Sequence, residues 1–323
     1  MLCSRTIRVR DSLARARLAS RHSKHACAGG MLLLAILTAP SLGCRALHCK
    51  TSDESITAAR SLSLQGMDAQ QKGNWTQAEQ HYAAAVEKSP TDERARCGYA
   101  EALWRRGAQS EAIAHMEQAV RLSGDDPQRQ IQLGRMYLSR GEINRALAAA
   151  DRAISSNKRS PEAWALRGDV LRAEGDRGDA LASYHRALSY QDHFPEVQLA
   201  VAEIYSQQNR PQRALATLQS LADRYPPGHT PTDVLFREGL VLRELGRYRD
   251  AATCLARATQ RGQPSADYLY ELGRTQLLVG DASAARLACL AALSSDPQHA
   301  ASQALKAELD GQQHRMAALV EPR

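Results

Sequence analysis

The stretch LGRMYLSRGEINRALAAADRA, from Leu133 to Ala153, decides the fold through the places of its smallest residues. Gly134, Gly141, Ala146 and Ala153 are separated by steps of seven, five and seven residues. The same steps recur along the chain, and successive copies begin 34 residues apart except at one step of 37. Self-similarity at such a fixed period predicts a repeat architecture rather than a set of separate domains.

Small residues stand at places eight, fifteen, twenty and twenty-seven of a 34-residue frame in six copies. Besides the copy quoted above, these are Gly66, Gly73, Ala78 and Ala85; Ala100, Gly107, Ala112 and Ala119; Gly168, Gly175, Ala180 and Ala187; Gly239, Gly246, Ala251 and Ala258; and Gly273, Gly280, Ala285 and Ala292. A seventh copy is degraded and has Ala202, Asn209, Ala214 and Leu221. The pattern therefore spans most of the chain.

Each frame is expected to form two helices joined by a turn. In the copy that begins at Pro161, Trp164 and Gly168 are four residues apart and share one face of the first helix. Gly175 ends that helix, because glycine adopts a positive φ at little cost. A second helix follows and carries Ala180 on its inner face. Small residues at places eight and twenty let the two helices approach closely, and the residue at place twenty-seven admits the next frame.

These frames resemble the tetratricopeptide repeat, a helix–turn–helix unit of 34 residues with small residues in this order. The resemblance implies an all-α fold, an α-solenoid in which stacked hairpins form a right-handed superhelix with a C-terminal capping helix. We assign a leader segment to 1–43, a linker to 44–58, seven frames to 59–298, and a capping helix and tail to 299–323. The frames start at Ala59, Glu93, Pro127, Pro161, Pro195, Thr232 and Ala266.

The chain departs from the family's pattern at a few sites, where we expect looser packing. Arg167 and Glu238, like Gln65, replace the family's usual leucine, while Asn209 and Leu221 interrupt the fifth frame. The proline-rich stretch 223–233 accounts for the longer step and predicts either a hinge or a rigid longer loop.

The basic excess of the chain lies in its first fifty residues. The formal net charge is +7, but residues 1–50 contain nine Lys and Arg against one acid, so the remainder carries a charge of −1. A neutral body does not supply the phosphate neutralisation that nucleic-acid binding requires. An RNA-binding helical repeat of the pentatricopeptide kind is therefore disfavoured.

The leader resembles a secretory signal. An arginine-rich, acid-poor segment precedes a short apolar run from Met31 to Leu42, which is too short for an ordinary membrane span. The end of this run resembles a bacterial lipoprotein signal, which implies lipid attachment at Cys44, although Ser41 stands where the family usually has leucine. We expect export to a bacterial cell envelope, membrane-anchored or periplasmic. An uncleaved membrane anchor, an organelle-targeting presequence and a start at Met31 remain alternatives.

Nothing in the repeats points to chemistry. The sequence has no glycine-rich phosphate loop, no nucleophile elbow and no paired carboxylates in a pocket. The cysteines form no CxxC pair, and His81, His115 and His185 have no partner at metal-ligand spacing. We therefore predict no catalytic residues, no metal site and no cofactor, so the protein is not expected to be an enzyme.

In the family, the first helices line a concave groove that binds extended peptides or partner helices. By this resemblance the groove contacts are Trp104, Arg105, Arg135, Arg172, Phe236, Leu240, Arg243, Tyr270, Arg274 and Leu277. The inward places hold nearly equal numbers of basic and acidic residues, which predicts a mixed polar groove rather than an arginine-lined one for acidic tails. The last two frames are more apolar inside and are the better candidate for a contact site.

The family's two-carboxylate clamp is absent, because Ser63, Met67 and Gly98 stand at its places. The sequence thus predicts a scaffold or adaptor of the cell envelope that binds other proteins and is anchored to the membrane through its N-terminus. An alternative is a subunit, catalytic or not, of an envelope enzyme or assembly complex. Nucleic acid is not an expected partner.

Overall fold

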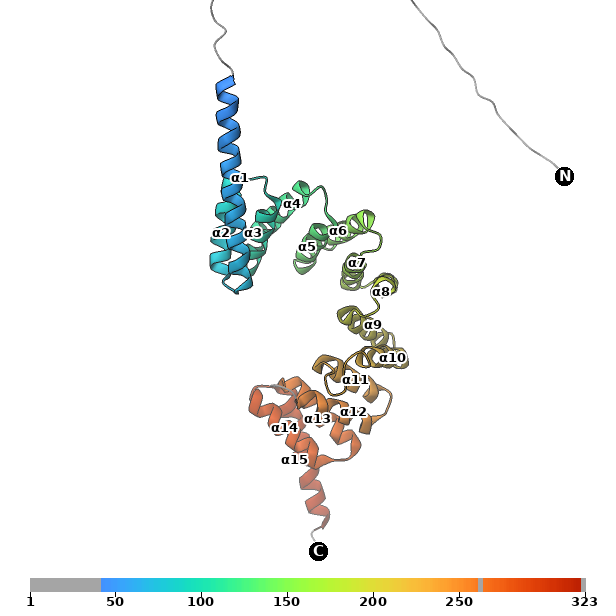
Figure 1. Cartoon of the computed structure of the whole chain (residues 1–323). Helices are drawn as coiled ribbons and strands as arrows, with labels where there is room; N and C mark the ends of the chain where they lie inside the picture. The colour runs from blue at the N-terminus through green and yellow to red at the C-terminus, as the bar shows by residue number, and fades with distance from the viewer. Residues whose placement is uncertain (1–41, 261–263, 321–323) are drawn as a thin grey trace, which may run out of the picture. The chain divides into compact units, whose positions relative to one another are not determined.

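A computed structural model describes residues 42–260 and 264–320, with side chains over 53–260 and 264–313. Throughout these residues every regular element is an α-helix, and no strand occurs. Consecutive helices contact one another along the repeats and form a succession of hairpins (Figure 1). The all-α solenoid expected from the repeat is confirmed.

Fifteen helices lie within the described residues. Their bounds are α1 Leu42–Gln71, α2 Trp75–Lys88, α3 Glu93–Arg106, α4 Gln109–Leu122, α5 Pro127–Ser139, α6 Ile143–Ser156, α7 Pro161–Glu174, α8 Arg177–Tyr190, α9 Pro195–Gln207, α10 Pro211–Ala222, α11 Thr232–Glu244, α12 Tyr248–Thr259, α13 Ala266–Val279, α14 Ala282–Ser295 and α15 Ala300–Val320. The helices α3, α5, α7, α9, α11 and α13 begin at the residues assigned as the starts of frames two to seven. Each frame thus contains an odd-numbered first helix and an even-numbered second helix.

Local capping explains why the first helices begin where they do. The side chain of Asp126 accepts hydrogen bonds from the first backbone amides of α5, and Ser160 does the same for α7. Such caps satisfy amides that have no partner inside the helix. Pro127 and Pro161 occupy the first helical position, where the missing N–H costs nothing.

The turn inside each frame uses a left-handed residue. Gly175 has φ +97°, and its N–H donates to the carbonyl of Arg172 at the end of α7. Asn209 stands at the same place of the degraded fifth frame and has φ +57°. Asparagine tolerates this conformation better than most residues, so the fifth frame keeps the turn without a glycine.

Close helix approach depends on the small residues. A Cβ atom built on Gly168 would lie 2.5 Å from the Tyr184 ring, and one on Gly66 would lie 2.8 Å from the Tyr82 ring. Both rings come from the second helix of the same frame. The residues at places twenty and twenty-seven are all fully buried, namely Ala78, Ala112, Ala146, Ala180, Ala214, Ala251, Ala285, Ala85, Ala119, Ala153, Ala187, Leu221, Ala258 and Ala292.

The expectation of looser packing is wrong at Leu221. Leu221 is fully buried on the inner face of α10, like Leu218, and adds apolar area where other frames have alanine. Arg167 donates hydrogen bonds to Ser183 at 2.8 Å and to Asp151 at 3.2 Å, so a polar network replaces the leucine. The family's pattern could not indicate these compensating partners.

The hydrophobic core continues across the loop between α10 and α11. Ala214 and Leu218 of α10 belong to one buried cluster with Val241 and Leu242 of α11. A continuous core on both sides of the loop 223–233 is consistent with a rigid loop. Whether this loop acts as a hinge stays a prediction. At the other end, Leu305 and Leu309 of α15 are buried against α14, which places a helix over the last frame.

The chain divides into two compact units, Met1–Cys49 and Lys50–Arg323, and all seven frames lie in the second. The predicted leader lies outside the described residues except at positions 42 and 43. Residues 44–58, assigned as a linker, are helical and belong to α1, since no glycine or proline interrupts them. Cys44 falls in α1, but its side chain is not among those described.

Candidate functional site

First helices of successive frames meet through charged side chains. A carboxylate oxygen of Glu203 in α9 lies 3.7 Å from a nitrogen of Arg172 in α7 and 3.5 Å from one of Arg237 in α11. The surface that carries these contacts is termed the first-helix face. It is the surface to which the repeat resemblance assigns partner binding.

A groove of about 1190 Å³ lies on this face between α1, α3 and α5. It is termed the N-terminal groove. A neighbouring depression beside Trp104 and Arg135 holds only about 270 Å³. The larger groove is lined by Ile56, Arg60, Leu64 and Met67 of α1, by Arg94, Glu101 and Arg105 of α3, and by Arg129 of α5, among others.

One wall of the N-terminal groove is apolar and uncovered. Leu64 is 60% exposed, Met67 is 45% exposed and Ile56 is 36% exposed. They follow one another along α1 at intervals of eight and three residues, which places them on one face of the helix. Large apolar side chains gathered beside a groove mark a surface that gains free energy when a partner covers it.

The floor of the groove is held rigidly by a buried tyrosine. Tyr82 donates to Gln70 at 2.8 Å, and Gln70 in turn donates to Glu101 at 3.1 Å. The ring packs so closely that Cβ atoms on Gly66 and Gly98 would lie 2.8 and 2.4 Å from it. Burial, with the nearby carboxylate of Glu101, raises the pKa of Tyr82 to about 12. The phenol therefore stays neutral and fixed.

Four arginines line the groove, and their charges are not neutralised by an ion pair among the described residues. Within residues 53–260 and 264–313, Arg60, Arg94, Arg105 and Arg129 form no ion pair with a carboxylate. The guanidinium of Arg105 lies 4.7 Å from the ring centroid of Trp75, a cation–π contact. The buried Nε of Arg129 has no hydrogen-bond partner. Arg60, Arg94 and Arg105 are exposed and can bind a ligand, whereas the Nε of Arg129 is enclosed by the protein.

The first helices α9, α11 and α13, termed the C-terminal face, behave differently. The ring of Phe236 stacks on that of Tyr268, with centroids 3.8 Å apart and planes 4° from parallel. Tyr270 meets the ring of His299 edge-on at 5.8 Å. Leu277 packs against the cluster beneath α15. Phe236, Tyr270 and Leu277 therefore have intramolecular partners, whereas Leu278 of α13 is 48% exposed.

Some charged side chains of the later frames are paired within the chain, while Arg274 of α13 is exposed and forms no ion pair among the described residues. Arg243 forms an ion pair with Glu271 on the neighbouring first helix, and both side chains are largely buried. Tyr184 donates to Asp169 at 2.7 Å. Burial raises the pKa of the Asp169 carboxyl, and the bond from Tyr184 opposes this shift. Glu203 is shared between two arginines, as described above.

The ten predicted groove residues do not form one site. Arg105 alone lines the N-terminal groove, while Trp104 and Arg135 line the smaller depression beside it. Leu240 is half-buried and Arg274 is exposed on the later first helices. These residues line different surfaces of the first helices, and their role in partner binding stays a prediction.

Sequence reasoning missed the contribution of the first frame. Arg60 and Met67 occupy places two and nine of that frame, and Arg94 and Glu101 occupy the same places in the second. These matching places in the two frames could have been recognised from the sequence. The exposure of Leu64 was not, because it depends on which neighbours cover α1.

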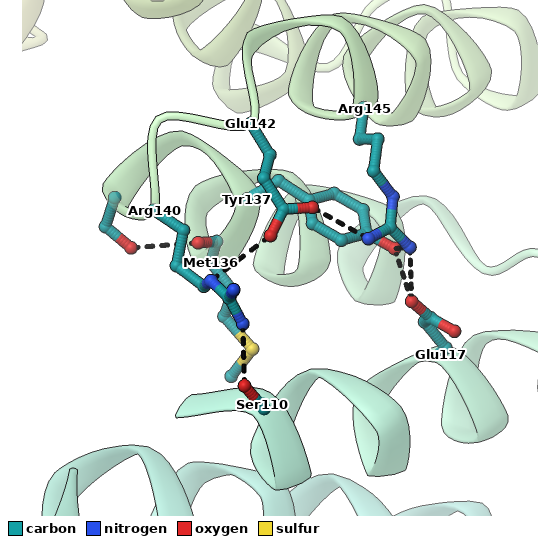
Figure 2. Close-up of polar contacts among 8 residues, drawn as sticks. Ser110, Glu117, Met136, Tyr137, Arg140, Glu142 and Arg145 are labelled. Carbon is teal, nitrogen blue, oxygen red and sulfur yellow. Dashed lines mark hydrogen bonds and ion pairs between the residues drawn. The ribbon is translucent and has the colours of Figure 1, made fainter. Parts of the chain in front are cut away.

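Polar contacts join the second and third frames away from the groove (Figure 2). Tyr137 of α5 donates to Glu117 of α4 at 2.8 Å, and Arg145 of α6 lies 2.5 Å from the same carboxylate. The guanidinium also lies 4.1 Å from the centroid of the Tyr137 ring. Arg140 donates to Ser110 at 3.0 Å, a second link to α4. Burial and the bond to Glu117 raise the pKa of Tyr137 to about 12.

The described side chains offer no metal site and no reactive thiol. Over residues 53–260 and 264–313, no three His, Cys, Asp or Glu side chains gather as a metal site would require. Cys97, Cys254 and Cys289 are free and buried, and burial raises the pKa of each thiol. Such cysteines are poor nucleophiles. In the described part of the chain, no helix has the length and apolar content to cross a membrane.

Solved structures share this fold. The chain is similar to a tetratricopeptide repeat protein from Parabacteroides merdae, with 17% identity and a TM-score of 0.59 over 78% of this chain and 98% of that one. It is also similar to yeast Tom70, with 16% identity and a TM-score of 0.55 over 84% of this chain and 57% of that one. PilF of Pseudomonas aeruginosa gives 15% identity and a TM-score of 0.50 over 80% and 99%. At these identities the likeness concerns the fold alone.

Family comparisons agree with the repeat register. One tetratricopeptide repeat family matches residues 63–127 and 236–300, and a second matches 105–170 and 171–229. No curated protein sequence matches the chain. Tetratricopeptide repeats form scaffolds for protein–protein interaction, and proteins built from them are generally not catalytic. The matches cover well over half of the 323 residues, and the chain belongs to the tetratricopeptide repeat family.

Proposed function

We propose that this protein is a scaffold that holds a segment of another protein in its N-terminal groove and performs no chemistry itself. One observation supports this most directly: the groove combines exposed apolar side chains with arginines that have no internal ion pair. Burial of Leu64 and Met67 would contribute the hydrophobic part of the binding energy. Arginine donors would fix the orientation of the bound segment.

The proposed place of action is a bacterial cell envelope. The support is the leader sequence, in which a charged start and a short apolar run precede Cys44. Lipid on Cys44 would hold the scaffold at the membrane, provided that more than one acyl chain is attached. Labelling with a fatty-acid probe tests this: the natural protein should incorporate the probe and Cys44→Ser should not. Equal labelling of the two proteins, or none, rejects the anchor.

The scaffold itself is tested by photocrosslinking of the full chain in its native cells. A photoreactive amino acid replaces Met67 in the groove or, as the matched control, Gln80, an exposed residue of α2 that does not line the groove. We expect one protein to crosslink at position 67 and not at position 80. Equal crosslinking at both positions, or none at position 67, rejects the groove as the binding site.

A further inference from the structure

We infer that the segment bound in the N-terminal groove carries side-chain carboxylates next to aliphatic residues. This inference rests on the proposed function and adds the chemistry of the partner. It follows from which groove side chains already have partners and which have none.

Two of the three acidic residues that line the groove accept hydrogen bonds within the chain, whereas the third, Glu93, has no such partner among the described residues. The carboxylate of Asp92 accepts hydrogen bonds from the backbone amides of Arg94 and Ala95, and so caps α3. Glu101 accepts a hydrogen bond from Gln70. Arg94 and Arg129, in contrast, have no carboxylate partner among the described residues. The groove is thus lined by four arginines and three acidic residues, and one of these acids is used to cap a helix.

Arg129 lines the same groove from α5, but part of its guanidinium is buried. Its buried Nε has no hydrogen-bond partner, and its Nη1 reaches Gln132 only at 3.4 Å. A carboxylate in the groove can bind the accessible nitrogens of an arginine with two parallel bonds. Arg105 is held over the Trp75 ring and keeps its outer nitrogens available. Both positions suit a carboxylate rather than a neutral group.

The apolar wall of the groove determines which side chains the bound segment should turn toward α1. Ile56, Leu64 and Met67 lie along about 17 Å of α1, since eleven residues rise about 1.5 Å each. Methionine and leucine adapt to aliphatic side chains of different shape. A segment with aliphatic residues toward α1 and carboxylates toward α3 and α5 would satisfy both walls at once.

The recognised carboxylates belong to side chains, not to a chain terminus. The places of the family's terminal-carboxylate clamp hold Ser63, Met67 and Gly98, none of which has a charged donor. The free arginines are instead spread over three helices. An internal segment of a partner therefore fits the groove as well as a tail does. A nucleic acid would leave the aliphatic wall uncovered.

The test uses the full chain and a labelled synthetic peptide of leucine and glutamate in equal numbers. Three matched peptides replace glutamate by glutamine, replace leucine by serine, or carry a C-terminal amide. Binding is followed by fluorescence anisotropy at low and raised salt. The protein variants are Arg94→Gln combined with Arg129→Gln, and Arg249→Gln, an exposed arginine outside the groove, as control.

We expect the glutamine peptide and the serine peptide to bind at least about tenfold more weakly, with the amide equal to the parent. The double variant should lose a similar factor, Arg249→Gln should lose none, and added salt should weaken binding. Equal binding of the glutamine peptide, or no binding of the parent peptide, overturns the inference. Crosslinking at position 67 would still support the scaffold in that case, so the two failures are distinguishable.

Discussion

The N-terminal groove and the C-terminal face are built from the same frame, yet they differ in where their side chains find partners. In the groove, Leu64 and Met67 face solvent and Arg94 has no carboxylate. On the C-terminal face, Phe236 stacks on a tyrosine and Arg243 pairs with Glu271. The comparison teaches that a repeat register fixes which residues share a surface, while contacts between frames decide which of them stay available.

The largest difference in stability between the two regions should come from truncation of an apolar side chain. Phe236→Ala removes a stacked ring that packs against a buried cluster, so we expect a loss of about 2–3 kcal/mol in the free energy of unfolding. Met67→Ala removes an exposed side chain and should change it by less than about 0.5 kcal/mol. Guanidinium unfolding followed by circular dichroism measures both. A similar loss at the two positions would mean that the groove wall is already covered.

The alanine skeleton should respond equally in both regions. Ala112→Leu and Ala251→Leu each overpack a fully buried position at place twenty, and each should cost about 1–3 kcal/mol. The exposed Ala148 provides the control, and Ala148→Leu should be nearly neutral. Thermal unfolding of the three variants compares them. If one region tolerated its leucine, the frames would not share the same helix approach.

The polar link between the second and third frames should make a smaller contribution, with a characteristic pH dependence. Tyr137→Phe removes the hydroxyl that bonds Glu117 and Arg145, at a cost of about 1 kcal/mol near neutral pH. The pKa of Tyr137 is raised from 10.0 to about 12 in the fold. Its contribution is therefore complete below pH 10 and is lost as the pH rises toward 12, because the unfolded chain ionises first.

Unfolding measured between pH 8 and about 12 tests this sign. The natural protein should lose stability more steeply than Tyr137→Phe above pH 10. The difference between the two proteins matters, since Tyr82 and Tyr268 also have raised pKa values. Parallel curves would show that the hydroxyl is not held as in Figure 2.

Removal of single charges should give the smallest effect. Arg243→Gln breaks a largely buried ion pair with Glu271 and should cost about 0.5–1 kcal/mol. Arg94→Gln breaks no ion pair and should leave the free energy of unfolding unchanged. Urea unfolding at two salt concentrations measures both variants. A stability loss at Arg94 would show that its charge is already used inside the chain.

Much of the fold could be predicted from residue spacing. The steps between small residues located six helix starts and the turn glycines, since only tiny side chains permit close helices and only glycine readily takes a positive φ. Asn209 and Leu221 show the limit of the pattern. Each departs from it, yet the first keeps the left-handed turn and the second is fully buried.

The candidate site was less predictable, because a count of acidic and basic residues does not show which of them form ion pairs. Nearly equal numbers of acids and bases indicated a mixed groove along all frames. In the structure, Glu203 and Glu271 neutralise arginines of the later frames, and Asp92 and Glu101 accept hydrogen bonds within the earlier ones. Among the arginines of the described residues that form no ion pair, Arg60, Arg94, Arg105 and Arg129 line one groove beside an exposed apolar wall.

Residue spacing is enough to specify the architecture, because the period and the small residues act locally, within one hairpin and its neighbour. Which surface of which frames stays open to a partner depends on the packing between frames. Ion pairs and ring stacking join residues about one frame apart, at distances that depend on how helices meet. A spacing pattern holds no information on such pairings, so the free arginines and the bare apolar wall of α1 emerged from the packing alone.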